Sequence, residues 1–179
     1  MTARTLALAL VLGGAVLAPP VLAEEGAARG RLDEFNADVY RGPETARVAF
    51  GLTFGDVHPS GYWWSYGARA LWTQYLDDAP RVRGWGLGGV AGLGFRPERV
   101  VSPVTGIALD RVFGTDGYFD WQVAVHAGAR VRVSKDLPEH YAITFALYHQ
   151  SIFGTGGFPD QTDTGLAIFY SAATFEPAR

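Results

Sequence analysis

Apolar and polar side chains alternate along most of the chain. The clearest case is the segment Phe119–Val133, in which every odd-numbered position is aromatic, Val or Ala and every even-numbered position is polar or small. Successive side chains of a strand point to opposite faces, so this segment predicts a strand with one wholly apolar face. A helix would instead scatter Arg130 and Arg132 around its circumference.

The same two-residue period recurs in further segments separated by clusters rich in Gly, Pro and Asp. The clear segments are Val48–Phe54, Tyr62–Thr73, Trp85–Phe95, Tyr141–Leu147 and Leu166–Ser171, and weaker ones lie near Phe35–Tyr40 and Val104–Val112. The longest turn-rich cluster is Ile152–Thr164. The pattern therefore predicts about eight strands and an all-β fold.

Two all-β architectures fit this pattern: a soluble sandwich and a membrane barrel. Several segments reach about ten residues, the length of a tilted spanning strand, and aromatic residues gather near segment ends, as interfacial girdles do. The non-apolar face carries glycines and the arginines Arg69, Arg96, Arg130 and Arg132, for which Asp110 and Asp120 are candidate partners in a lumen. We therefore predict an eight-stranded antiparallel transmembrane outer-membrane β-barrel.

The N-terminal residues have the layout of a secretory signal. Arg4 precedes the apolar run Leu6–Leu17, and Pro19-Pro20-Val21-Leu22-Ala23 follows it, with a small residue before the expected cut. This run is shorter than the roughly 20 residues of a membrane helix, and no later stretch is long enough for one. We expect a signal peptide at residues 1–23, the barrel domain at residues 24–179, and integral location in the outer membrane of a Gram-negative cell.

Composition excludes several classes of function. The chain has no Cys, which rules out thiolate catalysis and Cys-ligated metals, and its net charge of −3 gives no support for nucleic-acid binding. No pair of histidines has zinc-ligand spacing. His126 lies on the polar face and is predicted to be a hydrogen-bonding lumen residue, whereas His58 and His140 fall in turns. We expect neither a metal nor a cofactor.

One strand carries polar residues on its apolar face. In Tyr141–Ser151 the apolar odd positions continue as His149 and then Ser151. Residues two apart lie about 6.5–7 Å apart on one face, so rotamers can bring an imidazole nitrogen to a serine hydroxyl, the minimal activated nucleophile. The acids Asp160 and Asp163 follow across the last hairpin. The alternative is that His149 and Ser151 mark where the strand enters the headgroup layer.

These residues also carry a family resemblance. Tyr148-His149-Gln150-Ser151, then Gly154, Pro159 and the strand Leu166–Tyr170, together with Ala46–Tyr75 and its paired tryptophans, resemble the PagL family of outer-membrane lipid A 3-O-deacylases. The resemblance implies an eight-stranded barrel whose active site lies on the lipid-facing wall. It implies Ser151 as the nucleophile, His149 as the general base, the Gly154 amide in the oxyanion hole, and lipid A of lipopolysaccharide as the substrate.

Two positions depart from the family pattern. Asp160 stands where the family has Asn, and Thr164 stands at the place of the triad Glu. We predict that Asp163, re-aimed by a bulge at the hairpin edge, orients His149 and completes a Ser-His-acid ester hydrolase. The alternatives are a non-enzymatic structural barrel with a degraded site, and a soluble β-sandwich or lipocalin-like binder. A homodimer is a further expectation.

Overall fold

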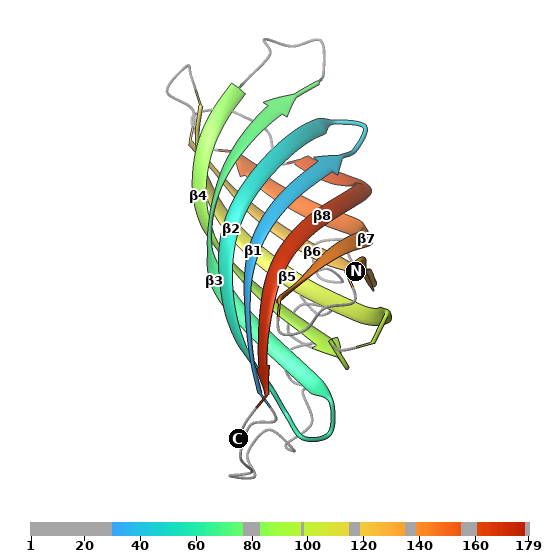
Figure 1. Cartoon of the computed structure of the whole chain (residues 1–179). Helices are drawn as coiled ribbons and strands as arrows, with labels where there is room; N and C mark the ends of the chain where they lie inside the picture. Colours follow the sequence, from blue (N-terminus) through green and yellow to red (C-terminus); the bar gives the residue numbers. More distant parts are fainter. Residues whose placement is uncertain are drawn as a thin grey trace, which may run out of the picture.

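The computed structural model describes residues 30–76, 83–97, 99–114, 119–134, 139–154 and 161–177; the predicted signal peptide lies outside them. They form eight strands: β1 (Gly30–Arg41), β2 (Thr45–Val57), β3 (Tyr62–Tyr75), β4 (Arg83–Phe95), β5 (Val101–Gly114), β6 (Phe119–Arg132), β7 (Glu139–Gly154) and β8 (Gln161–Pro177). The strands pair in chain order as one closed antiparallel barrel (Figure 1).

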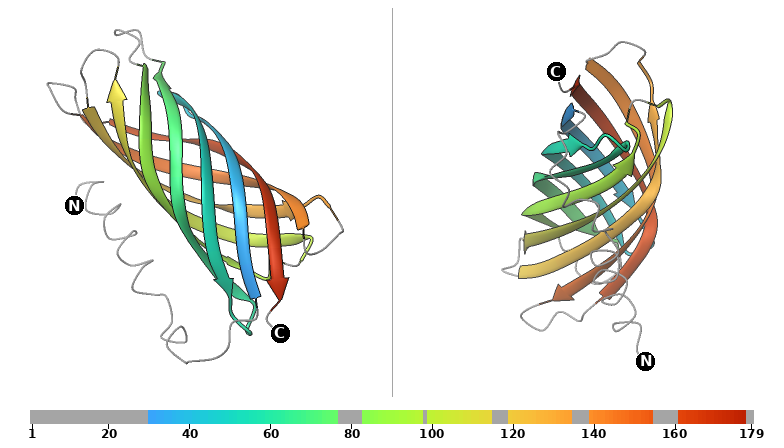
Figure 2. Two further views of the ribbon diagram at one scale, coloured as in Figure 1. Left: turned by 60° about the vertical axis from the view of Figure 1, so that its left-hand side comes forward. Right: turned by 90° about the horizontal axis from the view of Figure 1, so that it is seen from below.

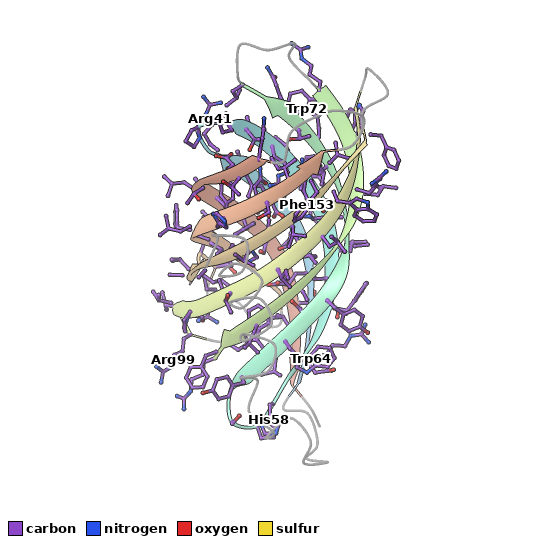
Figure 3. The ribbon with its side chains drawn as sticks, turned by 180° about the vertical axis from the view of Figure 1, so that it is seen from behind. Arg41, His58, Trp64, Trp72, Arg99 and Phe153 are labelled. Atoms are coloured by element: carbon purple, nitrogen blue, oxygen red, sulfur yellow. The ribbon has the colours of Figure 1, made fainter. Side chains whose placement is uncertain are left out.

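The first and last strands close the barrel against each other. Their register runs from Gly30 opposite Pro177 to Arg41 opposite Leu166. The start of β1 and the end of β8 therefore lie at the same end of the barrel, which is called the terminal end. The opposite end, where β1 turns into β2 and β7 into β8, is called the loop end. Figure 2 shows the tilted strands wound around one lumen, and in Figure 3 Arg41 and Trp72 lie toward the loop end while His58, Trp64 and Arg99 lie toward the terminal end.

The exterior of the barrel is apolar. Trp85, Leu87, Leu147 and Leu166 are each 65–69% exposed, and Phe and Tyr side chains cover much of the remaining wall. Closure leaves no unpaired strand edge, which is the condition for a sheet to cross a lipid bilayer. An apolar outer wall around a polar interior is the architecture of outer-membrane barrels, so the predicted fold class and integral outer-membrane location are confirmed. A soluble sandwich or a soluble lipocalin-like binder would place the apolar faces inside, and that alternative is wrong.

The interior is filled by paired charges and by two apolar clusters. Near the loop end, Arg69 donates to both oxygens of Asp110, at 2.9 and 2.5 Å, and Arg47 donates to the same carboxylate at 3.2 Å. Toward the terminal end, Arg130 pairs with Glu34 at 2.7 Å. A cavity of about 70 Å³ remains beside Asp38 and His126, room for about two waters. Among the described residues, side chains therefore fill most of the lumen.

The strands are longer than the sequence pattern predicted. The weak segment at 35–40 extends to Gly30–Arg41, and the predicted turn cluster Ile152–Thr164 is too long, because β7 continues to Gly154 and β8 already begins at Gln161. The extra residues keep strict alternation of faces. The described part of the chain contains no helix long and apolar enough to cross a membrane.

Candidate active site on the outer wall

His149 and Ser151 lie on the outward face of β7, close to the loop end. Both side chains are partly exposed, and their neighbours on that strand face are Leu147, 66% exposed, and Phe153, 42% exposed. His149 and Ser151 therefore form a small polar patch on the apolar outer wall, as the alternation predicted. Because it lies outside the lumen, a substrate would reach it through the membrane.

The next strand supplies a partner for the imidazole. Thr164 of β8 stands directly opposite His149 in the ladder, and its Oγ1 lies 2.7 Å from His149 Nδ1. This contact leaves Nε2 as the ring nitrogen available to Ser151 or a substrate. Thr162, the next outward-facing residue of β8 toward the loop end, stands opposite Ser151. Four polar residues from two strands thus share one patch of the wall.

The prediction that Asp163 orients His149 is wrong. Asp163 points into the barrel and is 3% exposed, because β8 keeps regular alternation and no bulge re-aims this side chain. Its carboxylate accepts hydrogen bonds from Thr45 Oγ1 at 2.6 Å, from the Thr45 backbone N–H at 3.1 Å and from Tyr148 Oη at 3.1 Å. The Glu44 backbone N–H adds a longer contact at 3.4 Å.

Asp163 therefore has a structural task that sequence analysis missed. It ties the β1–β2 turn to β8 and joins a buried chain of side chains that runs through Thr45 and Gln150 to Arg47 and Asp110. The alternation along β8 places odd-numbered side chains inside the barrel and so predicts an inward Asp163. The expected need for a triad acid pointed the other way. Within the described part of the chain, no carboxylate contacts His149.

The other predicted site residues lie apart from the His149–Ser151 patch or outside the described residues. Gly154 ends β7 in regular pairing with Asp120. It lies three positions after Ser151, about 10 Å along the strand, so its oxyanion role stays a prediction. Asp160 and Pro159 lie outside the described residues. His126 faces the lumen cavity, as predicted. Among the described residues there is no group of three or more His, Cys, Asp or Glu that could hold a metal ion.

The patch holds two of the three groups that a Ser-His-acid site would need, a serine and a histidine. A serine and a histidine two residues apart on one strand face can exchange a proton, and the Thr164 hydroxyl holds the far side of the ring. No hydrogen bond between His149 and Ser151 is present among the described contacts; such catalytic hydrogen bonds are often long without substrate and tighten in the complex.

Comparisons with known proteins give likenesses of architecture. The chain is similar to the N-terminal β-barrel domain of Pseudomonas aeruginosa OprF (13% identity, 80% of this chain and 98% of that chain, TM-score 0.46). It is also similar to Neisserial surface protein A (12%, 86% and 100%, TM-score 0.45) and to outer membrane protein AlkL (13%, 87% and 95%, TM-score 0.43). No protein-family model and no curated protein matches the chain.

Proposed function

We propose that this barrel is a carboxylic-ester hydrolase of the outer membrane that removes the 3-O-linked hydroxyacyl chain of lipid A. The observation that carries the proposal is the Ser151–His149–Thr164 patch on the lipid-facing wall. Polar side chains that face hydrocarbon cost free energy, and a substrate that is itself a membrane lipid gives them a task. The sequence resemblance to lipid A deacylases points to the same chemistry.

In the proposed reaction His149 Nε2 takes the proton of Ser151 while the serine oxygen attacks the ester carbonyl. The tetrahedral intermediate collapses, the imidazolium returns the proton to the departing sugar oxygen, and an acyl-serine remains. Water, deprotonated by the same nitrogen, then attacks the acyl-serine. The imidazolium returns that proton to the departing Ser151 oxygen, which releases the hydroxy fatty acid and restores the serine. No cofactor takes part in these steps.

Thr164 sets an expected limit on the rate. A carboxylate only accepts hydrogen bonds, so it fixes the proton on Nδ1 and stabilises the imidazolium by its charge. A hydroxyl both donates and accepts, so it fixes the tautomer less strictly and supplies no charge. We therefore expect slow turnover in the native chain and faster turnover in Thr164→Glu.

The apolar wall around the patch suits the acyl chains. Leu147, Leu166, Phe145 and Ile168 form an exposed surface on the terminal-end side of His149, and each is at least 47% exposed. If the terminal end faces the periplasm, this surface lies at the depth of the lipid tails and the patch lies nearer the headgroups, where ester bonds are found. Hydrophobic contact would then position the substrate.

The test is the mass of lipid A from Gram-negative cells that express the chain. We expect loss of one hydroxyacyl chain with the native sequence and no loss with Ser151→Ala or His149→Ala, because removing a triad member costs on the order of 10³-fold or more in rate. Thr105→Ala, which removes an outward hydroxyl on β5, is the matched control and should keep the activity. Unchanged lipid A with the native sequence and with Thr164→Glu would contradict the proposal.

The second candidate function is a structural barrel without catalysis. It is favoured by the absence of a carboxylate beside His149 among the described residues. It predicts that lipid A has the same mass in cells with and without the protein. Activity that appears only in Thr164→Glu would identify a site that has lost its acid.

A further inference from the structure

Thr162 is the polar residue of the outer patch to which the proposed reaction assigns no role. It stands directly opposite Ser151 in the β7–β8 ladder, and the next outward pair toward the terminal end is His149 opposite Thr164. The Thr162 side chain is exposed on the outer wall. Two hydroxyl-bearing residues of β8 therefore stand opposite the two polar site residues of β7.

The two sides of Ser151 differ in chemistry. On the β6 side, Val123 stands opposite Ser151 and Val125 stands opposite His149. On the β8 side, the residue opposite Ser151 is Thr162. The β6 side of the patch is thus apolar and suits an acyl chain, whereas the β8 side carries hydroxyl groups. An ester held against Ser151 would therefore turn its carbonyl oxygen toward β8.

The neighbouring pair shows how far side chains reach across these two strands. His149 Nδ1 and Thr164 Oγ1 are 2.7 Å apart although they come from directly opposite positions on different strands. Directly opposite residues of an antiparallel pair have Cβ atoms about 4.5–5.5 Å apart, and Ser151 and Thr162 are related in the same way. The Thr162 hydroxyl can therefore reach an oxygen bonded to the carbon that Ser151 attacks.

His149 and Thr162 approach Ser151 from different directions. His149 lies two residues away along β7, at about 6.5–7 Å, whereas Thr162 lies across the ladder on β8. An ester hydrolase needs such a separation, because the base takes the proton of the serine while a hydrogen-bond donor contacts the carbonyl oxygen of the substrate. The positions of the two side chains around Ser151 meet this requirement.

We propose that the Thr162 hydroxyl donates a hydrogen bond to the oxyanion that forms when Ser151 attacks the ester. As the serine oxygen bonds to the carbonyl carbon, the π electrons of the C=O bond move onto its oxygen, and the hydrogen bond stabilises this negative charge. Thr162 keeps its proton throughout. The C=O bond re-forms when the sugar oxygen departs with the proton from His149. The inference rests on the esterase proposal and adds Thr162 to its catalytic residues.

A neutral side-chain donor suits this place on the wall. An ionised side chain that faces hydrocarbon costs far more free energy than a hydroxyl does. The backbone N–H groups of β7 take part in the ladders, because this strand is paired on both sides. Gly154, the donor that the family resemblance implies, lies about 10 Å farther along the strand than Ser151. The Thr162 hydroxyl is a donor that the ladders leave available beside the serine.

The test uses the full-length mature protein in detergent micelles and an alkyl fluorophosphonate. The Ser151 oxygen bonds to phosphorus, fluoride leaves, His149 takes the proton, and the P=O oxygen occupies the place of the oxyanion. Mass spectrometry of the intact protein measures the labelling rate, with Ser151→Ala as the unlabelled reference. Thr162→Val removes the hydroxyl and should lower this rate by about 10²–10³-fold, the effect of losing one oxyanion donor. Thr162→Ser restores a hydroxyl and should be labelled at close to the native rate.

Thr174→Val is the matched control, because Thr174 lies at an outward position of β8 near the terminal end, and it should be labelled at the native rate. The gel shift of unheated samples checks folding, Thr162→Ala replaces Thr162→Val if the latter fails to fold, and each comparison is repeated in the Thr164→Glu background. Labelling of Thr162→Val at the native rate, or an equal loss in Thr162→Ser or Thr174→Val, would overturn the role of Thr162 and leave the esterase proposal standing. Absence of Ser151 labelling in both backgrounds would overturn both proposals.

Discussion

Replacing Asp163 with Asn separates a structural role from a catalytic one. The carboxylate is 3% exposed and accepts two hydrogen bonds from Thr45 and one from Tyr148. Asparagine keeps the shape but presents an NH₂ group on one side. The Thr45 and Tyr148 hydroxyls can turn to accept from it, whereas the backbone N–H groups of Glu44 and Thr45 cannot, so at least one donor loses its acceptor.

The magnitude follows from these contacts. Hydrogen bonds to a charged group contribute about 1.5–3 kcal/mol each, and a buried donor without a partner costs about 1–3 kcal/mol. Losing one such bond and weakening the others should lower the free energy of unfolding by about 2–4 kcal/mol. With a urea dependence of about 2 kcal/mol per molar, the unfolding midpoint should fall by about 1–2 M.

The assay is urea unfolding of the barrel in lipid vesicles, followed by tryptophan fluorescence. Asp33→Asn is the matched control: it removes the same charge from the exposed pair with Arg31, and exposed pairs contribute only about 0–1 kcal/mol. The reasoning is refuted if both variants shift the midpoint equally. A stable Asp163→Asn barrel that has lost ester hydrolysis would restore Asp163 as the acid of the site.

Two further substitutions test the packing of the barrel. Gly67→Ala should lower the free energy of unfolding by more than about 1 kcal/mol, as overpacking does, because the new methyl group would collide with the carbonyl oxygen of Leu52. Gly89→Ala is the control and should be close to neutral, because its methyl group would lie 3.7 Å from its nearest neighbour. Arg69→Met should cost about 3–5 kcal/mol, since it leaves the buried Asp110 carboxylate with Arg47 as its remaining cationic partner. Both are measured by urea unfolding, and a Gly89→Ala barrel less stable than Gly67→Ala, or an Arg69→Met barrel as stable as the native one, would contradict these accounts.

The faces of the strands could be predicted from sequence, but the partners across strands could not. A period of two assigns each side chain to the wall or the lumen, so the outward His149 and Ser151 and the inward Arg69 and Arg130 follow from parity alone. Which residues meet depends on register, and register is set by how the closed sheet staggers its strands. The sequence therefore predicts that Asp110 faces the lumen with the arginines, but it does not predict that Arg130 pairs with Glu34.

The error at Asp163 has the same physical origin. Strict alternation placed it inside, and its neighbour Thr164 outside, yet the chemistry of a triad favoured the charged residue. A bulge would be needed to turn Asp163 outward. That turn would take away the acceptor of the buried Thr45 N–H and of the part-buried Glu44 N–H, which explains why no bulge forms. The hydrogen bonds that Asp163 accepts inside the barrel therefore hold its side chain away from His149.

Ser151 is the residue that best distinguishes the two candidate functions. His149 Nδ1 lies 2.7 Å from Thr164 Oγ1. This hydrogen bond would stabilise the pair on the outer wall even if the barrel were not an enzyme. The described contacts include no hydrogen bond of the Ser151 side chain, so its partly exposed hydroxyl is open to a substrate, a lipid headgroup or water. The proposed nucleophile needs an open hydroxyl, so Ser151→Ala should abolish hydrolysis if the barrel is an esterase, whereas a structural barrel has no hydrolysis to lose.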